Sequence, residues 1–534
     1  MAVTVCEWYD AAASRFRIEV TVHNRRWGPF FGYRGSFDVE WRETPALTLD
    51  LCEYRDMKVT FVGHASILVE VGGISILSDP WWRGPCFGAQ WWNYPEPFLR
   101  LLEGRRVDYI YVSHGHHDHF HPATLNTLNK DATVLVSAHT GLAPGIRDLG
   151  FDVVEVPDTQ AVALGRGGVS CRIIETCGSD TLMTITDGTE VCVNLNDALH
   201  SAPEALQRAF VARLKTLHPR MDYVFCGYGV ASHFPNCYAI PGKDREATAA
   251  RRQRYFNRQW ARLIAGLQPV YGFPFAADVV LLENDLFWAN EATHNTERPT
   301  VTLAAEYPGC PVKTIDIAPG FVIEDGRVIQ ESLRRPVLAS NLLRDCAGGI
   351  ERANRYRSVD DQDVKEVAEL LSDKVAVWAE HLKGYAGDYR FLIRFHNGQS
   401  GVRIQKRGQS LSVEPVRVDG QGFDVAYTTR LAYLKGALTR PFGDELLFVG
   451  SGGVFEYADQ AQARRNMHRE LMHLLRSDGT PPASRGPSKS GMVFQAKQIV
   501  KRMLGRKDLD LYDLGTWTVF RADRRSGGEA AVNG

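Results

Sequence analysis

The pattern of apolar and polar positions divides the chain into segments of different secondary structure. In residues 1–56, RFRIEVTVHN and FDVEWRE alternate apolar and polar residues, as half-buried strands do. From Met57, KVTFVGHASILVEV, a Gly-Gly turn at 72–73 and ISILSDP predict a β-hairpin. The β-branched runs VDYIYVS, ATVLVSA and GFDVVEV follow, separated by helical stretches. Strands alternating with helices in this way predict a layered α/β domain over 57–345, after an N-terminal β segment.

The later part of the chain predicts one long helix and then a second domain. Residues 243–267 have apolar residues at helical spacing, and Arg251, Arg252 and Arg254 are most simply the solvated face of this helix, with binding of an anionic group as the alternative. Amphipathic helices and β-like segments predict an α+β domain over 355–476. We expect this domain to cover a pocket of the first domain or to mediate self-association. Residues 477–534 are expected to hold a linker, a basic docking helix and a tail.

Composition excludes several classes of function. The chain has 534 residues, enough for two or three domains, and its 62 Lys and Arg nearly balance its 63 Asp and Glu. This balance gives no reason to bind nucleic acid or an anionic membrane. No secretory signal and no apolar run of about 20 residues is present. The ten cysteines form no CxxC pair, which favours a protein of the reducing cytoplasm.

The motif that carries chemistry is the H-x-H-x-D-H in DYIYVSHGHHDHFHPATL. It follows directly after a predicted strand, which offers a rigid platform for the loop. Imidazoles two residues apart can bind one metal, and the Asp and His just downstream can reach a second one. The remaining histidines of the segment, His117 and His121, fall outside this register. The pattern therefore predicts a two-metal site whose first ligands are His114, His116, Asp118 and His119.

This motif is the signature of the metallo-β-lactamase superfamily, which the chain resembles. The resemblance implies an α/β fold, the metallo-β-lactamase αββα sandwich, here with a short N-terminal β segment and an α+β C-terminal domain. VTFVGHASILVEVGGISILSDPWW resembles the first hairpin of that fold, which makes Asp79 the acidic residue that braces the metal loop. VCVNLND resembles the later strand whose terminal Asp bridges the two metals, and this nominates Asp197.

Within the superfamily, the chain most resembles the non-Rieske part of CMP-N-acetylneuraminate hydroxylase. The resemblance rests on SDPWWRGPCFGAQWW, YIYVSHGHHDH, SHFPNCY, LQPVYGFPFA and IDIAPGFVIEDGRV, and runs from about residue 57 to about 340. It departs from that family at the N-terminus, where a Rieske cluster needs two cysteines and two histidines in paired motifs. Residues 1–56 offer only Cys6, Cys52 and His23, so we expect no Rieske centre here and an external donor for any electrons.

The later metal ligands also depart from the family pattern. The fold usually supplies a His near IIETCGSDTLMTI, where this chain has Glu175, Cys177 and Asp180, of which Glu175 is the expected ligand and Cys177 could equally be a core residue. The gap-free match places Glu283 at the last ligand position, with a surface carboxylate as the alternative and His294 as the nearest histidine. A shell with more carboxylates suits iron or manganese better than zinc.

Other residues are candidates for the pocket. His64 is expected either to line it or to be a hydrogen-bonded core residue. Trp82 and Trp92, from an aromatic-rich segment, are expected to form a substrate wall, with core packing as the alternative. His233 in SHFPNCY is a candidate metal ligand, general acid or base, or hydrogen-bond donor to a metal ligand. Asp118 is the other candidate catalytic residue.

These observations favour an iron-dependent oxygenase, possessing two metal ions, that hydroxylates a small biosynthetic substrate. The alternative is a zinc- or manganese-dependent hydrolase of a phosphodiester, lactone or amide, in which Asp118 orients a metal-bound hydroxide. A third class is a binding protein that has kept the fold and lost its metals. The intact H-x-H-x-D-H motif argues against this third class.

Overall fold

The computed structural model describes residues 2–10, 15–24, 28–37 and 57–477, with gaps at 101, 166, 177–179, 230–233, 383–386, 441–442, 465–470 and 472–473. The chain divides into two compact units, 1–54 and 55–534, so the two domains predicted at 57–345 and 355–476 lie within one unit. Cys177, His233, the basic helix near 492–507 and most of FDVEWRE lie outside the described residues.

The first unit is a three-stranded antiparallel sheet in the order β1-β2-β3. The strands are β1 (Ala2–Asp10), β2 (Arg15–Asn24) and β3 (Gly28–Phe37). The alternating pattern of RFRIEVTVHN thus correctly predicted β2.

The second unit begins with an eight-stranded sheet, in the order β10-β9-β8-β6-β5-β4-β20-β21. The predicted hairpin is β5 and β6, joined by Gly72 and Gly73, whose φ angles of 56° and 76° are those of a two-residue hairpin turn. The strands are β4 (Lys58–Gly63), β5 (Ser66–Val71), β6 (Ile74–Ser78), β8 (Tyr109–Tyr111), β9 (Thr133–Ser137), β10 (Asp152–Val156), β20 (Val322–Glu324) and β21 (Arg327–Gln330).

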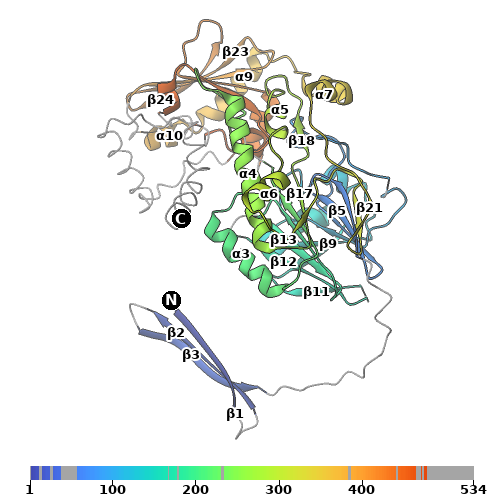
Figure 1. Ribbon diagram of the computed structural model, residues 1–534. Helices are drawn as coiled ribbons and strands as arrows, with labels where there is room; N and C mark the ends of the chain where they lie inside the picture. Colours follow the sequence, from blue (N-terminus) through green and yellow to red (C-terminus); the bar gives the residue numbers. More distant parts are fainter. Residues whose placement is uncertain are drawn as a thin grey trace, which may run out of the picture. The chain divides into compact units, whose positions relative to one another are not determined.

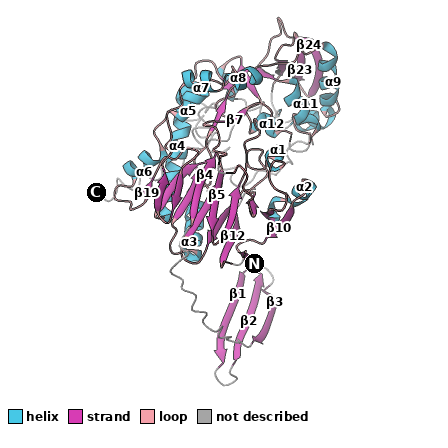
Figure 2. Cartoon of the chain, turned by 90° about the vertical axis from the view of Figure 1, so that its right-hand side faces the viewer, coloured by secondary structure: helices cyan, strands magenta, loops and turns pink. Residues whose placement is uncertain are grey.

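A seven-stranded sheet lies against the first one, in the order β11-β12-β13-β14-β15-β17-β19 (Figure 2). Its strands are β11 (Ala161–Leu164), β12 (Val169–Glu175), β13 (Thr181–Thr186), β14 (Val191–Asn196), β15 (Tyr223–Gly227), β17 (Tyr271–Phe275) and β19 (Lys313–Thr314). A separate pair joins β7 (Trp91–Asn93) to β18 (Val279–Leu281).

The side chains of both sheets sort into an inner core and two outer cores. Ile67 and Phe225 belong to the core between the sheets, whereas the next residue Leu68 and the preceding residue Val224 lie in the outer cores. The strands read as continuous apolar runs because both of their faces are buried. Helices cover the outer faces, which gives the αββα order of layers (Figure 1). The main covering helices are α2 (Ala143–Asp148), α3 (Glu204–Leu217), α4 (Arg245–Leu267) and α6 (Pro299–Glu306).

The C-terminal part is an α+β layer that adds to the first domain. Its six-stranded sheet, in the order β16-β26-β25-β22-β23-β24, takes β16 (Tyr238–Ala239) from the metallo-β-lactamase-like part. The other strands and helices are β22 (Tyr389–Phe395), β23 (Ser400–Arg407), β24 (Ser410–Arg417), β25 (Val425–Thr429), β26 (Gly453–Tyr457), α9 (Asp361–Ser372), α10 (Val375–His381), α11 (Leu431–Thr439), α12 (Glu445–Phe448) and α13 (Gln460–Arg464).

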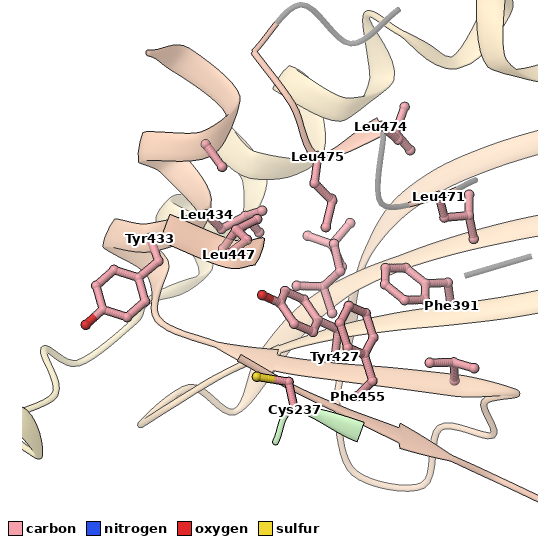
Figure 3. Packing of buried hydrophobic residues seen from close by; sticks show 14 of the residues in the cluster. Cys237, Phe391, Tyr427, Tyr433, Leu434, Leu447, Phe455, Leu471, Leu474 and Leu475 are labelled. Atoms are coloured by element: carbon pink, nitrogen blue, oxygen red, sulfur yellow. The ribbon is translucent and has the colours of Figure 1, made fainter. Parts of the chain in front are cut away.

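One core joins the two parts of the second unit. Figure 3 shows Cys237 of the segment preceding β16 beside Tyr427 and Phe455 of the C-terminal sheet. Phe87 and Trp91, from the aromatic segment of the sequence, belong to the same core. The aromatic segment therefore serves largely as the surface on which the C-terminal part packs. Among the described helices, none is long and apolar enough to cross a lipid bilayer.

Candidate metal centre

The ends of several strands bring the ligand-type residues together. The H-x-H-x-D-H loop follows β8, Asp79 follows β6, and Asp197 follows β14. His64, Asp79 and Asn196 have positive φ angles of 47°, 37° and 38°, which is uncommon for residues other than glycine. Such backbone conformations cost free energy and gather at functional sites, where the surrounding structure holds them.

Asp79 braces the loop, as the resemblance implied. Its carboxylate accepts hydrogen bonds from the Ser113 backbone N–H and from the Ser113 hydroxyl, both at 2.8 Å. The same carboxylate lies 2.9 Å from His119 Nδ1, at a site where all three side chains are buried. Because a carboxylate only accepts, Nδ1 carries the proton and the lone pair of His119 is on Nε2.

His119 Nε2 faces two further carboxylates. It lies 3.3 Å from Asp118 Oδ2 and 3.4 Å from Asp197 Oδ2. Burial alone lowers the pKa of His119, but the charges of Asp118, Asp197 and Asp79 raise this pKa well above its ordinary value. The His119 Nε2 lone pair and the two carboxylates repel one another unless a positive charge lies among them. The site therefore favours a proton or a metal ion at this point.

His114 and His116 form the second half of the centre. His114 Nε2 lies 2.8 Å from His116 Nδ1 and 3.8 Å from Asp180 Oδ1. Burial, and then the neighbouring His119, lower the pKa of His114 to about 4, so this imidazole is neutral at pH 7. Neutral imidazole is the form that binds metals.

The described residues fit bound metal ions. Ligand atoms within 4.8 Å of one another form three groups, two of which share His119 and two of which share His114. Asp118 Oδ1, His64 Nδ1 and His119 Nε2 are also buried without a hydrogen-bond partner, which is costly unless another group binds there. The groups are His64, Asp118 and His119; His114, His119 and Asp197; and His114, His116 and Asp180.

The structure places Asp180, and not the expected ligand Glu175, beside His114 and His116. Glu175 is the last residue of β12, and its carboxylate accepts a hydrogen bond from the Ser137 hydroxyl at 2.5 Å. Asp180, one residue before β13, is the carboxylate that reaches His114 and His116. Five of the residues predicted as ligands, His114, His116, Asp118, His119 and Asp197, do lie in the cluster. His64 joins them, with its Nε2 3.0 Å from Asp118 Oδ2.

The last ligand expected from the sequence, Glu283, lies elsewhere. Its carboxylate is 2.8 Å from Arg430 Nε and accepts a hydrogen bond from the Tyr433 hydroxyl at 3.0 Å. Both partners belong to the C-terminal part, so Glu283 ties the two parts of the unit together. Both ring nitrogens of His294 make other contacts. Its Nε2 lies 2.6 Å from the Val279 carbonyl oxygen, and its Nδ1 lies 3.2 Å from Arg334 Nη2.

Removing Arg430 is expected to destabilise the fold and to leave the metals in place. The Arg430→Met variant leaves Glu283 buried beside Tyr433 without its cation, which lowers the unfolding free energy by at most about 3–5 kcal/mol. The loss is smaller where Glu283 is protonated, because burial already raises its pKa to about 7. The double variant Glu283→Leu, Arg430→Met is expected to recover most of that loss. Denaturant unfolding measures both variants. Loss of metal from a Glu283→Gln variant would instead support the ligand role that the sequence predicted.

A cavity opens beside the metal centre. His64, Asp118 and Asp197 line it together with Trp91, and the C-terminal part contributes Ser451. The expected wall residues Trp82 and Trp92 lie elsewhere. Trp82 packs on the outer core of the first sheet, and Trp92 packs on the core around Val280 and Leu282.

Sequence reasoning named Asp180 as a candidate but preferred Glu175, and it missed two other residues around the centre. These are Arg298, which lines the cavity, and Glu445, which begins α12. Burial raises the pKa of Glu445 to about 7, while the neighbouring His116 lowers it. Glu445 Oε2 is buried without a hydrogen-bond partner. No motif marks Glu445 in the sequence, because only the packing of the C-terminal part brings it near His116.

Comparisons with known proteins agree with this geometry. The family model described as β-lactamase superfamily domain matches residues 58–206, and a model described as a domain of unknown function matches residues 1–37. Residues 58–206 thus match a domain of the β-lactamase superfamily, and the ligand cluster described above could hold metal ions.

Two groups of curated relatives are similar in sequence. A Mycolicibacterium smegmatis protein described as a Rieske 2Fe-2S iron–sulfur protein is 30% identical over 244 residues, which are 43% of this chain and 45% of that protein. The cytidine monophosphate-N-acetylneuraminic acid hydroxylase of Xenopus laevis is 36% identical over 91 residues, 17% of this chain and 15% of the hydroxylase. The chain thus spans less than half the length of these relatives.

Solved structures include distant neighbours of several activities. A diiron β-hydroxylase from Streptomyces venezuelae is 18% identical, with a TM-score of 0.34, over 51% of this chain and 54% of that one. A metallo hydrolase from Ignicoccus hospitalis is 16% identical, with a TM-score of 0.35, over 50% of this chain and 98% of the hydrolase.

Proposed function

We propose that this metalloenzyme is an iron-dependent oxygenase with two metal ions, which hydroxylates a small biosynthetic substrate. The observation that carries the proposal is the donor set, in which Asp180 stands beside His114 and His116 where the fold usually supplies an imidazole. With Asp118 and Asp197, the centre offers three carboxylates alongside its imidazoles. Mixed oxygen and nitrogen donors suit iron, whereas a histidine-rich shell suits zinc.

The sequence relatives support this reading. Their names describe a hydroxylase and iron–sulfur proteins. Hydroxylation of R–H by dioxygen gives R–OH and water and consumes two electrons and two protons. We propose that a separate iron–sulfur protein supplies those electrons one at a time.

The chain's own residues hold and line the reaction site. The metals would supply dioxygen binding and redox chemistry, held by the cluster residues described above. Asp79 fixes the ring of His119, so that Nε2 is presented to the metals. Trp91 and Ser451 contribute to the wall of the cavity beside this cluster.

Metal analysis under controlled oxygen tests the proposal. The full chain is expressed with iron, manganese and zinc available, purified without oxygen, and analysed for metal content per chain. About two irons, an optical change on admitting air, and dioxygen uptake with a chemical reductant are the expected results. An Asp180→His variant is expected to shift the bound metal toward zinc. Zinc in the unsubstituted protein, no response to air, and hydrolysis of a phosphodiester or lactone would establish the hydrolase instead.

A further inference from the structure

The wall of the cavity beside the metal centre contains two arginines. Arg252 and Arg298 line the same cavity as His64, Asp118 and Asp197. The carboxylates of the wall, Asp118 and Asp197, belong to the metal centre, where bound metals would offset their charge. The other charged side chains of the wall are the two arginines.

Arg298 is held in place with part of its donor set unused. Its Nε lies 3.2 Å from Asp316 Oδ1, and its Nη1 donates to the Tyr228 hydroxyl at 2.7 Å. Its Nη2 is buried without a hydrogen-bond partner. Guanidinium presents five N–H groups in a planar fork, and leaving buried ones unbonded is costly. Asp316 and Tyr228 therefore fix a guanidinium edge that remains available to a ligand.

Arg252 brings a second guanidinium to the cavity. It lies on α4, where it donates to the Phe234 carbonyl, and its guanidinium carbon is 5.4 Å from the Phe234 ring and 5.8 Å from the Phe256 ring. Burial lowers the pKa of Arg252 to about 10, so it stays protonated at neutral pH. Its neighbours Arg251 and Arg254 are exposed, as expected of a solvated helix face, whereas Arg252 turns inward.

We infer that the substrate carries an oxyanion, a carboxylate or phosphate group, which Arg298 and Arg252 bind while another part of the molecule faces the metals. Arginine forks match the planar or tetrahedral oxygens of these groups. Asn236, whose Oδ1 is buried in the wall without a partner, adds an acceptor for a hydroxyl or amine of the same substrate. This inference rests on the proposed function only in taking the cavity as the substrate pocket.

Anion titration of the metal-loaded full chain tests the inference. Inorganic phosphate and acetate are titrated by calorimetry into the unsubstituted protein and the Arg298→Gln and Arg252→Gln variants, with the exposed Arg254→Gln variant as control. Affinity for the preferred anion is expected to fall about tenfold or more in the first two and to stay unchanged in the control. Tighter binding of phosphate or of acetate indicates which oxyanion the substrate carries.

The outcomes separate this inference from the proposed function. Equal affinities in all four proteins would show that the anions bind only at the metals, and would overturn the subsite. An Arg298→Lys variant guards against misfolding, since it keeps the charge and is expected to bind with intermediate affinity. Metal content and dioxygen uptake of the unsubstituted protein are measured separately. Their failure would overturn the oxygenase and leave the anion result standing.

Discussion

Replacing Asp197 with asparagine is expected to lower metal affinity by more than about a hundredfold and to abolish dioxygen uptake. The Asp197 carboxylate is a candidate ligand, with its Oδ2 3.4 Å from His119 Nε2. Burial raises its pKa, but the charge of His119 lowers it further, so the group is ionised at neutral pH. An amide of the same size lacks the negative charge and one of the two acceptor oxygens.

The fold around Asp197 should survive this change. Its backbone N–H donates to Asn196 Oδ1 at 2.6 Å, and its carbonyl lies 2.5 Å from His200 Nδ1. Both contacts involve the main chain and are therefore retained. Metal content per chain and the midpoint of thermal unfolding, compared with the exposed Asp152→Asn control, separate loss of metal from loss of fold. Two metals bound at full occupancy in Asp197→Asn would refute the ligand role.

The sequence predicted the parts of the site that are local in the chain. His114, His116, Asp118 and His119 share one short loop, and the strand before it dictates where that loop starts. Asp197 was found because it directly follows the apolar run of β14. Such residues depend on one strand end each, which periodicity locates well.

Residues were harder to predict where their position depends on the path of a loop or on which face of a strand they occupy. Trp91 lines the cavity and Trp92 packs in another core, since neighbours in β7 point to opposite faces. An error of one position therefore exchanged a wall residue for a core residue. The choice between Glu175 and Asp180 depends on the path of the turn between β12 and β13, which the apolar pattern does not encode.

Contacts between distant parts of the chain had no local signal. From the sequence alone, Glu283 is equally consistent with a metal ligand and with a surface carboxylate. Only the fold shows that Arg430 and Tyr433 lie beside it. Those residues are about 150 positions away in the sequence. The run Arg251, Arg252 and Arg254 likewise could not show which arginine faces inward, because that depends on what packs against α4.

Replacing Asp79 with asparagine is expected to weaken metal binding by about 10–100-fold without removing any ligand. Asp79 accepts from the Ser113 N–H and hydroxyl and contacts His119 Nδ1 at 2.9 Å. An asparagine keeps one oxygen and places an NH2 against groups that donate. His119 then loses the carboxylate that keeps its proton on Nδ1. The proton can move to Nε2, and Nε2 is then unable to bind a metal.

The expected behaviour of Asp79→Asn differs from that of Asp197→Asn. All the cluster residues remain, so excess metal should restore activity in Asp79→Asn, whereas Asp197→Asn should stay inactive at any metal concentration. Unfolding free energy should also fall by about 1–3 kcal/mol, because the buried amide leaves a donor unpaired. Titration of the apo proteins with iron, followed by dioxygen uptake, measures both variants. Failure of excess iron to rescue Asp79→Asn would mean that Asp79 does more than orient His119, and that the metals depend directly on its charge.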